Sequence, residues 1–436
     1  MNLLIKNGHI IDPAQGIDKP GDILISKGKV SKLSFDEPTP EADTYIFDAR
    51  GLVVSPGFVD LHCHLRDPGF ADKETIATGS RAAAKGGFTT ICCMPNTSPP
   101  LDTKETIDYV KDTALKQGAA RILPIGCVSK GRAGRELADL KALAEAGAIG
   151  FSDDGSPVMD SAVMRQALEF SRVSKLPIMD HCEDLNLAKG GQMNEGMLSA
   201  RLDLSGIPGA AEEIMVARDL ILAELTQGWV HICHVSTANS VELIRRAKAK
   251  GIKVTAEATP HHLALTEALV TGYNPHAKVN PPLRSEEDVK TLASGLKEGI
   301  IDVIATDHAP HTESEKMAGF VQAPSGISVF ETALGTLMCL VESGIFTLSE
   351  LIARLTTAPA KLLGNKYGGL GTLSPGSEAD ITIFDPAKEW EVDTTQFLSK
   401  GKNTPLNGAV LRGKVMVTLC GGKVVYRDSS VKLEGI

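Results

Sequence analysis

Residues 51–66 read GLVVSPGFVDLHCHLR, an apolar run that ends in two histidines separated by one residue. Side chains of a β-strand alternate between its two faces, so His62 and His64 should point the same way from the end of one strand. Two imidazoles placed in this way can share a divalent metal ion. Arg66 continues the alternation and adds a fixed positive charge. The stretch predicts a metal pocket for an anionic substrate; the alternative is two histidines in a surface turn.

Short apolar runs of this kind recur along the chain and alternate with helix-like segments, which is typical of βα units and a parallel sheet. Eight such runs occupy residues 52–59, 89–94, 121–128, 148–152, 177–180, 229–235, 253–258 and 301–306. Helices are expected at residues 75–85, 136–146, 160–174, 240–250, 286–296, 329–342 and 348–363. Eight βα units predict a (β/α)8 TIM barrel over residues 56–365 within an α/β fold.

The two ends of the chain have a different pattern, because residues 1–55 and 366–436 read as β-hairpins. The expected strands are residues 3–6, 10–12, 22–26 and 29–33, followed near the C-terminus by 380–384, 408–412, 414–420 and 423–426. The turn at residues 26–29, Ser-Lys-Gly-Lys, fits a tight hairpin connection. We expect the two ends to pair into one small β-sandwich domain, with the barrel inserted between its halves.

The composition excludes several classes of protein. The 436 residues are ample for a barrel and a smaller unit. A net charge of −9 without a basic stripe argues against a nucleic-acid partner. The N-terminal residues do not resemble a signal peptide, and no apolar stretch is long enough to span a bilayer. The eight cysteines are scattered, unlike a secreted disulfide framework. We therefore expect a cytoplasmic protein with reduced thiols and no membrane partner.

Polar residues gather where the expected strands end, and the functional groups of TIM barrels lie at this rim. A single polar residue there most often only satisfies a strand–loop junction, but many on one rim predict a shared site. The candidates are His62, His64, Arg66, Asn96, Asp153, Asp154, His181, His231, His234, Asp307, His308 and His311. Alternation allows only one of His231 and His234, and only one of Asp153 and Asp154, to face inward.

Other residues near these strand ends have a structural interpretation. Cys63, Cys182 and Cys233 each adjoin a candidate histidine, so alternation places them on the opposite face as packing thiols. His261 and His262 end the seventh expected strand. A hydrogen bond to a metal ligand is the expected role for one of these two histidines.

The strand ends together resemble a known family. PGFVDLHCHLRDPG, GGFTTICCMPNTSPP, FSDDG, MDHCED, HICHVST, ATPHHL, VNPPLR and ATDHAPH, in this order, are similar to the class I, or long bacterial, dihydroorotases of the amidohydrolase superfamily. The opening IKNGHIIDP and the closing GTLSPGSEADITIFDP resemble the flanking sandwich of that superfamily. The His-x-His pair alone is a weak signal, but eight segments in order cover essentially the whole barrel.

The resemblance implies a site for two zinc ions per chain. The implied ligands are His62, His64 and Asp307 for one ion and His181 and His234 for the other, with Asp154 and a hydroxide bridging both. Related hydrolases of cyclic ureas and imides bridge their metals with a carboxylated lysine, which FSDDG does not offer. Zinc lowers the pKa of bound water to about 7, and Asp307 is the implied proton shuttle to the leaving ring nitrogen.

The implied reaction is the reversible cyclisation of N-carbamoyl-L-aspartate to L-dihydroorotate in de novo pyrimidine biosynthesis. The implied substrate contacts are His64, Arg66, Asn96, Asn280, His311, Ser325 and Gly326. Arg66, Asn96 and His311 would hold the carboxylate, since a bidentate arginine contact is strong and directional. A neutral ring would leave Arg66 unpaired. Ser325 stands where many class I members have Phe, so main-chain contacts are expected there.

Two rival functions are weighed beside this one. The first is a different cyclic-amide hydrolase, allantoinase-like or hydantoinase-like. The second is a silent homologue that supports aspartate carbamoyltransferase in a larger assembly; such a protein should lack metal ligands, and none is missing here. A homodimer is expected, and some class I members act only in association with aspartate carbamoyltransferase.

Overall fold

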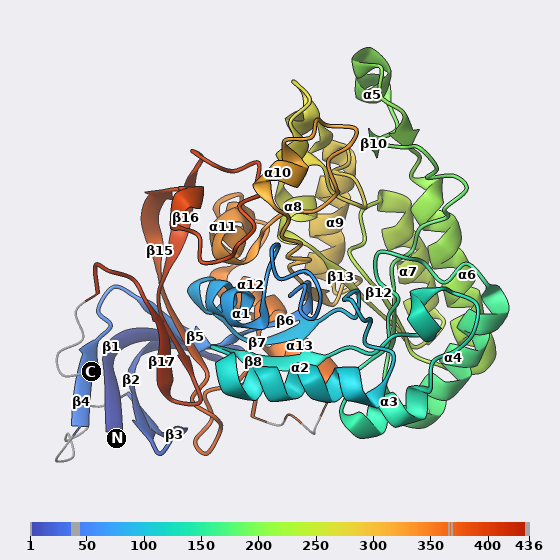
Figure 1. Ribbon diagram of the computed structural model, residues 1–436. Helices are drawn as coiled ribbons and strands as arrows, with labels where there is room; N and C mark the ends of the chain where they lie inside the picture. The colour runs from blue at the N-terminus through green and yellow to red at the C-terminus, as the bar shows by residue number, and fades with distance from the viewer. Residues whose placement is uncertain (1, 36–43, 365–366, 368, 432–436) are drawn as a thin grey trace.

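Both ends of the chain contribute strands to one sheet beside a larger α/β part (Figure 1). The structure is a computed structural model and describes residues 2–35, 44–364, 367 and 369–431. The sheet has the order β17-β16-β15-β5-β1-β2-β3, with β4 paired to β1. Its strands are β1 (Asn2–Asp12), β2 (Ile17–Ser26), β3 (Lys29–Ser34), β4 (Thr44–Asp48), β5 (Val53–Pro56), β15 (Ile381–Glu391), β16 (Val410–Cys420) and β17 (Lys423–Arg427). In Figure 1 the blue and red strands lie side by side.

Seven further strands form two parallel sheets among the described residues. One has the order β6-β7-β8 and the other β14-β13-β12-β9. Their bounds are β6 (Phe58–Cys63), β7 (Phe88–Cys93), β8 (Arg121–Pro124), β9 (Ile178–Asp180), β12 (Val230–Ile232), β13 (Val254–Ala258) and β14 (Val303–Ile304). Parallel bridges from Gly126 to Phe151, from Phe151 to Ile178 and from Cys63 to His308 connect these sheets at both sides. The pairings therefore lead from β6 through β7, β8, Phe151, β9, β12, β13 and β14, and the bridge at His308, just past β14, returns to β6.

Helices alternate with these strands and cover them from outside (Figure 1). They are α1 (Ile76–Lys85), α2 (Lys104–Gln117), α3 (Leu140–Ala146), α4 (Ser161–Ser174), α6 (Ala210–Thr226), α7 (Ala238–Ala249), α9 (Glu286–Glu298), α11 (Ala333–Glu342), α12 (Leu348–Leu355) and α13 (Thr357–Leu363). Side chains cap the starts of several of them: Thr75 accepts from the N–H of Thr78, and Asp160 from those of Ala162 and Val163.

Short elements lie above the strand ends that carry the polar residues. They are β10 (Met193–Asn194), α5 (Met197–Leu202), β11 (Gly206–Ile207), α8 (Pro260–Ala264) and α10 (Glu313–Lys316). No helix in the described ranges is long and apolar enough to cross a membrane.

The expected strand at residues 52–59 is two strands. β5 pairs with β1 and β15 in the sheet of the chain ends, whereas β6 pairs with β7. Gly57 separates them, and a Cβ added there would lie 2.1 Å from Oγ1 of Thr89. Only glycine therefore fits between the two sheets at this point.

Other expected elements also merge or break. Residues 3–6 and 10–12 belong to the single strand β1, whose register shifts between Ile5 and Gly8. Residues 408–412 and 414–420 form one strand, β16. Residues 148–152 make isolated bridges at Phe151 instead of a strand. The helix expected at 348–363 breaks at Thr356 into α12 and α13. The predicted domain boundary at residues 365–366 lies outside the described residues.

Candidate metal centre

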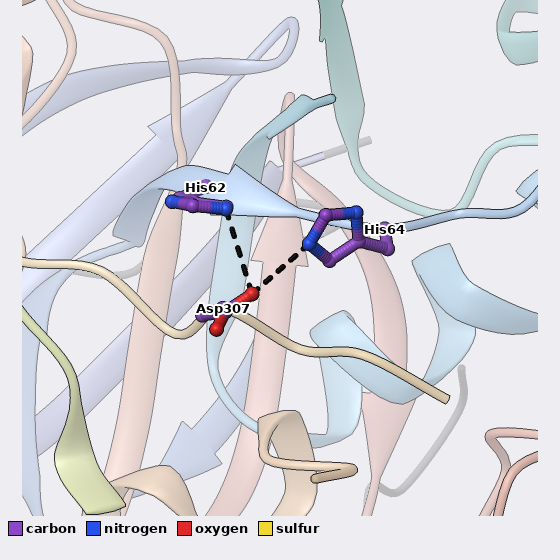
Figure 2. Close-up of side chains that lie close together, drawn as sticks. All are labelled: His62, His64 and Asp307. Atoms are coloured by element: carbon purple, nitrogen blue, oxygen red, sulfur yellow. Dashed lines mark hydrogen bonds and ion pairs between the residues drawn. The ribbon is translucent and has the colours of Figure 1, made fainter. Parts of the chain in front are cut away.

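His62, His64 and Asp307 converge where β6 and β14 end (Figure 2). Oδ1 of Asp307 lies 3.0 Å from Nε2 of His64 and 3.5 Å from Nε2 of His62. All three side chains are buried. Figure 2 shows both imidazoles directing a nitrogen toward the same carboxylate oxygen. These three donor atoms can therefore surround one point.

Asp154 connects this group to a second pair of histidines. Its Oδ2 lies 3.4 Å from Nε2 of His64, and its Oδ1 lies 3.4 Å from Nε2 of His62. The same Oδ1 lies 3.6 Å from Nε2 of His234 and 3.8 Å from Nδ1 of His181. Those two histidine nitrogens are 2.8 Å apart. The Asp154 carboxylate thus stands between two clusters of ring nitrogens.

The structure shows which member of each pair that alternation left open faces the cluster. The Asp153 carboxylate turns away from the cluster and accepts the backbone N–H groups of Val128 and Ser129. His231 contacts Thr255 and Glu257 instead of Asp154. His234 reaches the cluster although β12 ends at Ile232, because its backbone has φ 33° beyond the strand end.

The donor set fits divalent zinc. Imidazole nitrogens and carboxylate oxygens are the ligands that zinc binds in catalytic sites. Donor atoms of His62, His64 and Asp307 lie within 4.8 Å of one another, as do those of His62, Asp154 and His234. Nε2 of His62 and Oδ1 of Asp154 are buried without a hydrogen-bond partner among the described residues. Buried polar atoms of this kind call for a ligand.

The charges of the cluster also suit a cation. Burial raises the pKa of the Asp154 carboxyl, but His62 and the other neighbouring histidines hold that pKa well below its usual range. Burial is likewise outweighed at Asp307, whose pKa His62 and His64 keep low. Both carboxylates are therefore ionised donors at neutral pH.

A cavity of about 240 Å³ opens beside these residues. Its polar lining contains every substrate contact implied by the sequence: His64, Arg66, Asn96, Asn280, His311, Ser325 and Gly326. Asp154, His181, His234 and Asp307 line it as well. His62 is fully buried behind them. The cavity thus brings the predicted metal ligands and the predicted substrate contacts together.

Arg66 supplies the positive charge on one side of the cavity, and His311 lies beside it. Nη2 of Arg66 lies 3.3 Å from Nε2 of His311, and Nε of Arg66 donates to the carbonyl of Pro310. Burial and the Arg66 charge lower the pKa of His311 to about 3, so this ring is neutral. Its Nε2 lies 2.9 Å from the carbonyl oxygen of Ser325. Main-chain atoms at Ser325 are thus beside the cavity.

The loop that carries Ser325 is held by a buried lysine. Nζ of Lys316 donates to the carbonyls of Pro275, Lys278 and Pro324 at 3.0, 3.3 and 2.8 Å. The N–H of Gly326 donates to the carbonyl of Lys278. One ammonium group therefore joins residues 275–278 to Pro324 next to the cavity.

Glu257 is the residue that sequence reasoning missed. Its Oε1 lies 2.5 Å from Nδ1 of His62, so it contacts the candidate ligand on the side away from Asp154. The sequence feature that could have identified Glu257 is its position as a lone acidic residue inside the apolar run 253–258. Hydrogen bonding to a ligand was instead expected of His261 or His262, and this was wrong. His262 contacts Thr259 and the carbonyl of Pro281, while His261 has no hydrogen-bond partner among the described residues.

The position expected for Cys233 was also wrong. Its Sγ lies within 4.8 Å of donor atoms of His62 and Glu257, on the side where alternation did not place it. The reason is that β12 ends at Ile232, before the residues to which alternation was applied.

Residues 51–240 match the family model described as Dihydro-orotase-like. A dihydroorotase from Syntrophus aciditrophicus is 48% identical over 428 residues, which cover 98% of this chain and 100% of that protein. Dihydroorotases from Pelotomaculum thermopropionicum and Aquifex aeolicus are 49% and 51% identical, over 99% and 98% of this chain and 100% of each relative.

Solved structures of similar shape carry other names. An L-hydantoinase (dihydropyrimidinase) from Arthrobacter aurescens superposes with a TM-score of 0.87 at 28% identity, over 99% of this chain and 97% of that chain. A D-hydantoinase superposes with a TM-score of 0.86 at 25% identity, over 99% and 96%. The α/β architecture with an additional mixed sheet is therefore shared with cyclic-amide hydrolases.

Proposed function

The chain belongs to the dihydroorotase family, and from that premise we propose that it catalyses the reversible cyclisation of N-carbamoyl-L-aspartate to L-dihydroorotate in de novo pyrimidine biosynthesis. The observation that carries the proposal is the shared cavity, in which the Arg66 cation lies beside the histidine–aspartate cluster. Hydrolysis of a carboxylate-bearing ring needs the cation to bind the carboxylate and the cluster to hold the metal.

The finer assignment is the class I type of the amidohydrolase superfamily. The circle of parallel pairings supports a (β/α)8 barrel over residues 56–365, and the shared sheet supports a flanking β-sandwich domain from residues 1–55 and 366–436. Asp154, in place of a carboxylated lysine, supports the same assignment.

We propose two zinc ions per chain. His62, His64 and Asp307 would hold one, His181 and His234 the other, and Asp154 would contact both. When bound, zinc supplies a hydroxide at neutral pH and polarises the carbonyl that is attacked. The protein contributes a buried, ordered set of donors around it.

The chain's own residues then orient the ring and move the proton. Arg66, Asn96 and His311, which line the cavity, would bind the ring carboxylate and so fix the amide against the opposite side. Asp307 is ionised and can accept a proton at Oδ1 and deliver it to the leaving ring nitrogen. In the cyclisation direction the same carboxylate removes the proton from the ureido nitrogen. Asn280 lines the cavity where the ring would lie.

Hydantoin hydrolysis is the second candidate, and the similarity to hydantoinase structures favours it. Arg66 argues against it, because a neutral ring leaves this cation without a partner in a confined cavity. A role as an inactive support for aspartate carbamoyltransferase is disfavoured by the complete donor set.

The test measures zinc per chain and the turnover of L-dihydroorotate, hydantoin and dihydrouracil by one protein preparation. We expect bound zinc and a strong preference for L-dihydroorotate. Fast turnover of a neutral ring with L-dihydroorotate untouched would refute the proposal. The assay is run with and without added aspartate carbamoyltransferase, because the requirement for this partner is part of the question. Light scattering then checks the proposed homodimer, and fractionation of the source cells checks the proposed cytoplasmic location.

A further inference from the structure

A chain of hydrogen bonds leads from His62 away from the candidate metal centre. Glu257 accepts at Oε1 from Nδ1 of His62, at 2.5 Å, and its Oε2 lies 3.0 Å from Nε2 of His231. Nδ1 of His231 lies 2.9 Å from Oγ1 of Thr255, and Nε1 of Trp229 lies 2.8 Å from the same oxygen. The register produces this order: His231 on β12 is directly opposite Thr255 on β13, with Trp229 two residues before and Glu257 two residues after.

The direction of these hydrogen bonds is set at the Trp229 end, far from His62. An indole N–H can only donate, so Trp229 donates and Oγ1 of Thr255 accepts. The Thr255 hydroxyl is then free to donate to Nδ1 of His231. That places the proton of His231 on Nε2, from which it is donated to Glu257. The second oxygen of the carboxylate accepts the Nδ1 proton of His62.

The opposite arrangement, in which His231 donates to Thr255, leaves the hydroxyl proton of Thr255 without an acceptor. A doubly protonated His231 would donate to Oγ1 of Thr255 from Nδ1. This oxygen would then accept from both of its partners in the described part of the chain, and its own hydroxyl proton would have no acceptor. A buried donor without an acceptor is destabilising. With a neutral His231 every member of the chain is paired.

Two further observations concern the His62 end of this series of hydrogen bonds. Nε2 of His62 has no hydrogen-bond partner among the described residues, although it is fully buried. Oε1 of Glu257 also accepts the backbone N–H of His234, at 3.2 Å. One carboxylate thus contacts two histidines of the candidate metal centre, one through its ring and one through its backbone.

We propose that Trp229, Thr255, His231 and Glu257 form a one-way hydrogen-bond relay that fixes the proton of His62 on Nδ1 and presents its Nε2 lone pair to the metal. They are positioning residues, because they act through His62. The inference rests on the proposed function in taking His62 as a metal ligand. The proton positions along the relay are independent of that assumption.

The first test uses the full chain without metal or substrate, labelled with ¹⁵N in its histidine rings. Long-range ¹H–¹⁵N correlation reports which ring nitrogen is protonated, and His62→Gln and His231→Gln assign the two rings. We expect His62 protonated at Nδ1 and His231 at Nε2. A His231 protonated at Nδ1 or at both nitrogens, or a His62 without a proton on Nδ1, would overturn the proposal. Absence of zinc binding or turnover would instead count against the proposed function, and this spectrum would be unaffected.

The second test changes the donor that sets the direction. Trp229→Phe should convert His231 from one tautomer to a mixture, because the Thr255 hydroxyl can then point either way. Trp390→Phe is the matched control, since Nε1 of Trp390 donates to the carbonyl of Gly413 in the sheet of the chain ends. It should leave the spectrum unchanged. An unchanged His231 in Trp229→Phe would show that the relay has no direction set by the indole.

The third test measures zinc affinity by competition with a chelator. Glu257→Gln should lower the affinity by about 10- to 100-fold. The control Glu331→Gln removes a buried carboxylate that accepts the N–H groups of Leu398 and Ser399, and should leave the affinity unchanged. If Glu257→Gln does not fold, Thr255→Val carries the test, with Thr255→Ser restoring wild-type affinity. Zinc affinity equal to wild type in a folded Glu257→Gln, or in Thr255→Val if Glu257→Gln does not fold, would overturn the relay.

Discussion

Replacing Arg66 by methionine tests the basis of substrate choice. The change removes the charge from the cavity and keeps an unbranched side chain of similar reach. It also removes the contacts of Arg66 with His311 and the Pro310 carbonyl. The metal-binding donors are unchanged, because Arg66 makes no ion pair with Asp154 or Asp307 in the described part of the chain. The effect should therefore appear in the recognition of the ring.

The size of the effect follows from leaving the ring carboxylate unpaired in a confined site. Removing one partner of a buried ion pair costs about 3–5 kcal/mol. Because about 1.36 kcal/mol corresponds to a factor of ten, kcat/KM for L-dihydroorotate should fall by about 150- to 5000-fold. Dihydrouracil lacks the carboxylate, so its kcat/KM should stay the same or rise.

The assay compares initial rates with both rings for the wild type, Arg66→Met and Arg66→Lys at equal zinc content. Lysine keeps the charge but not the planar pair of donors, so Arg66→Lys should lie between the other two. Unfolding midpoints and zinc per chain serve as controls for a changed structure. The informative quantity is the ratio of kcat/KM for the two rings.

An equal loss with both rings would refute this reasoning. Such a result would mean that Arg66 supports the loop through the Pro310 carbonyl and does not bind the carboxylate. Loss of zinc from Arg66→Met would also refute it, because the change would then have altered the metal-binding residues and not only the recognition of the ring.

Three other changes are expected to have distinct effects. Asp307→Asn should abolish turnover while the unfolding midpoint stays close to wild type; near-normal rates would exclude Asp307 as the proton shuttle. Gly326 has φ +146°, and a Cβ there would lie 2.7 Å from the carbonyl oxygen of Ala309. Gly326→Ala should therefore displace the loop and raise KM for L-dihydroorotate while zinc content is kept; an unchanged KM would count against a loop contact. Burial and Lys278 lower the pKa of Lys316 to about 7. The unfolded chain holds this proton up to about pH 10.4, so the free energy of unfolding of the wild type should rise between about pH 7 and 10.4 relative to Lys316→Met. Denaturant titrations at several pH values measure this difference; parallel plots of unfolding free energy against pH for the two proteins would contradict it.

The location of the site was predictable because parallel strands bring their carboxyl ends to one edge. Polar residues far apart in the sequence, such as Asn96 and His311, line one cavity for this reason. The alternation argument was less reliable, although His62, His64 and Arg66, which it placed on one side, all lie at or beside the cavity. β6 ends at Cys63, and its register against β7 shifts between Asp60 and Cys63. Arg66 reaches the cavity from a left-handed backbone conformation beyond the strand end, which no alternation rule describes.

The contacts behind the site could not be predicted from one sequence. Glu257 stood out only as a charge within an apolar run, and its partners come from two other strands. Which side chains meet across the interior depends on strand register. The register here includes shifts at β1 and β6 that leave no clear mark in residue type. The error at Cys233 has a different cause, because β12 ends at Ile232, before that residue.

The shared sheet has a consequence for the order in which the chain can fold. β5 lies between β1 and β15, and the hydroxyl of Ser55 contacts the carbonyl of Thr382, 327 residues away. During synthesis, β5 therefore presents an unpaired edge until the ribosome has released nearly the whole chain. Only Gly57 separates this edge from the strand that carries His62. Exposed edges pair with other chains, and long-range pairing is slow. Before β15 emerges, this edge of β5 is thus open to pairing with other chains.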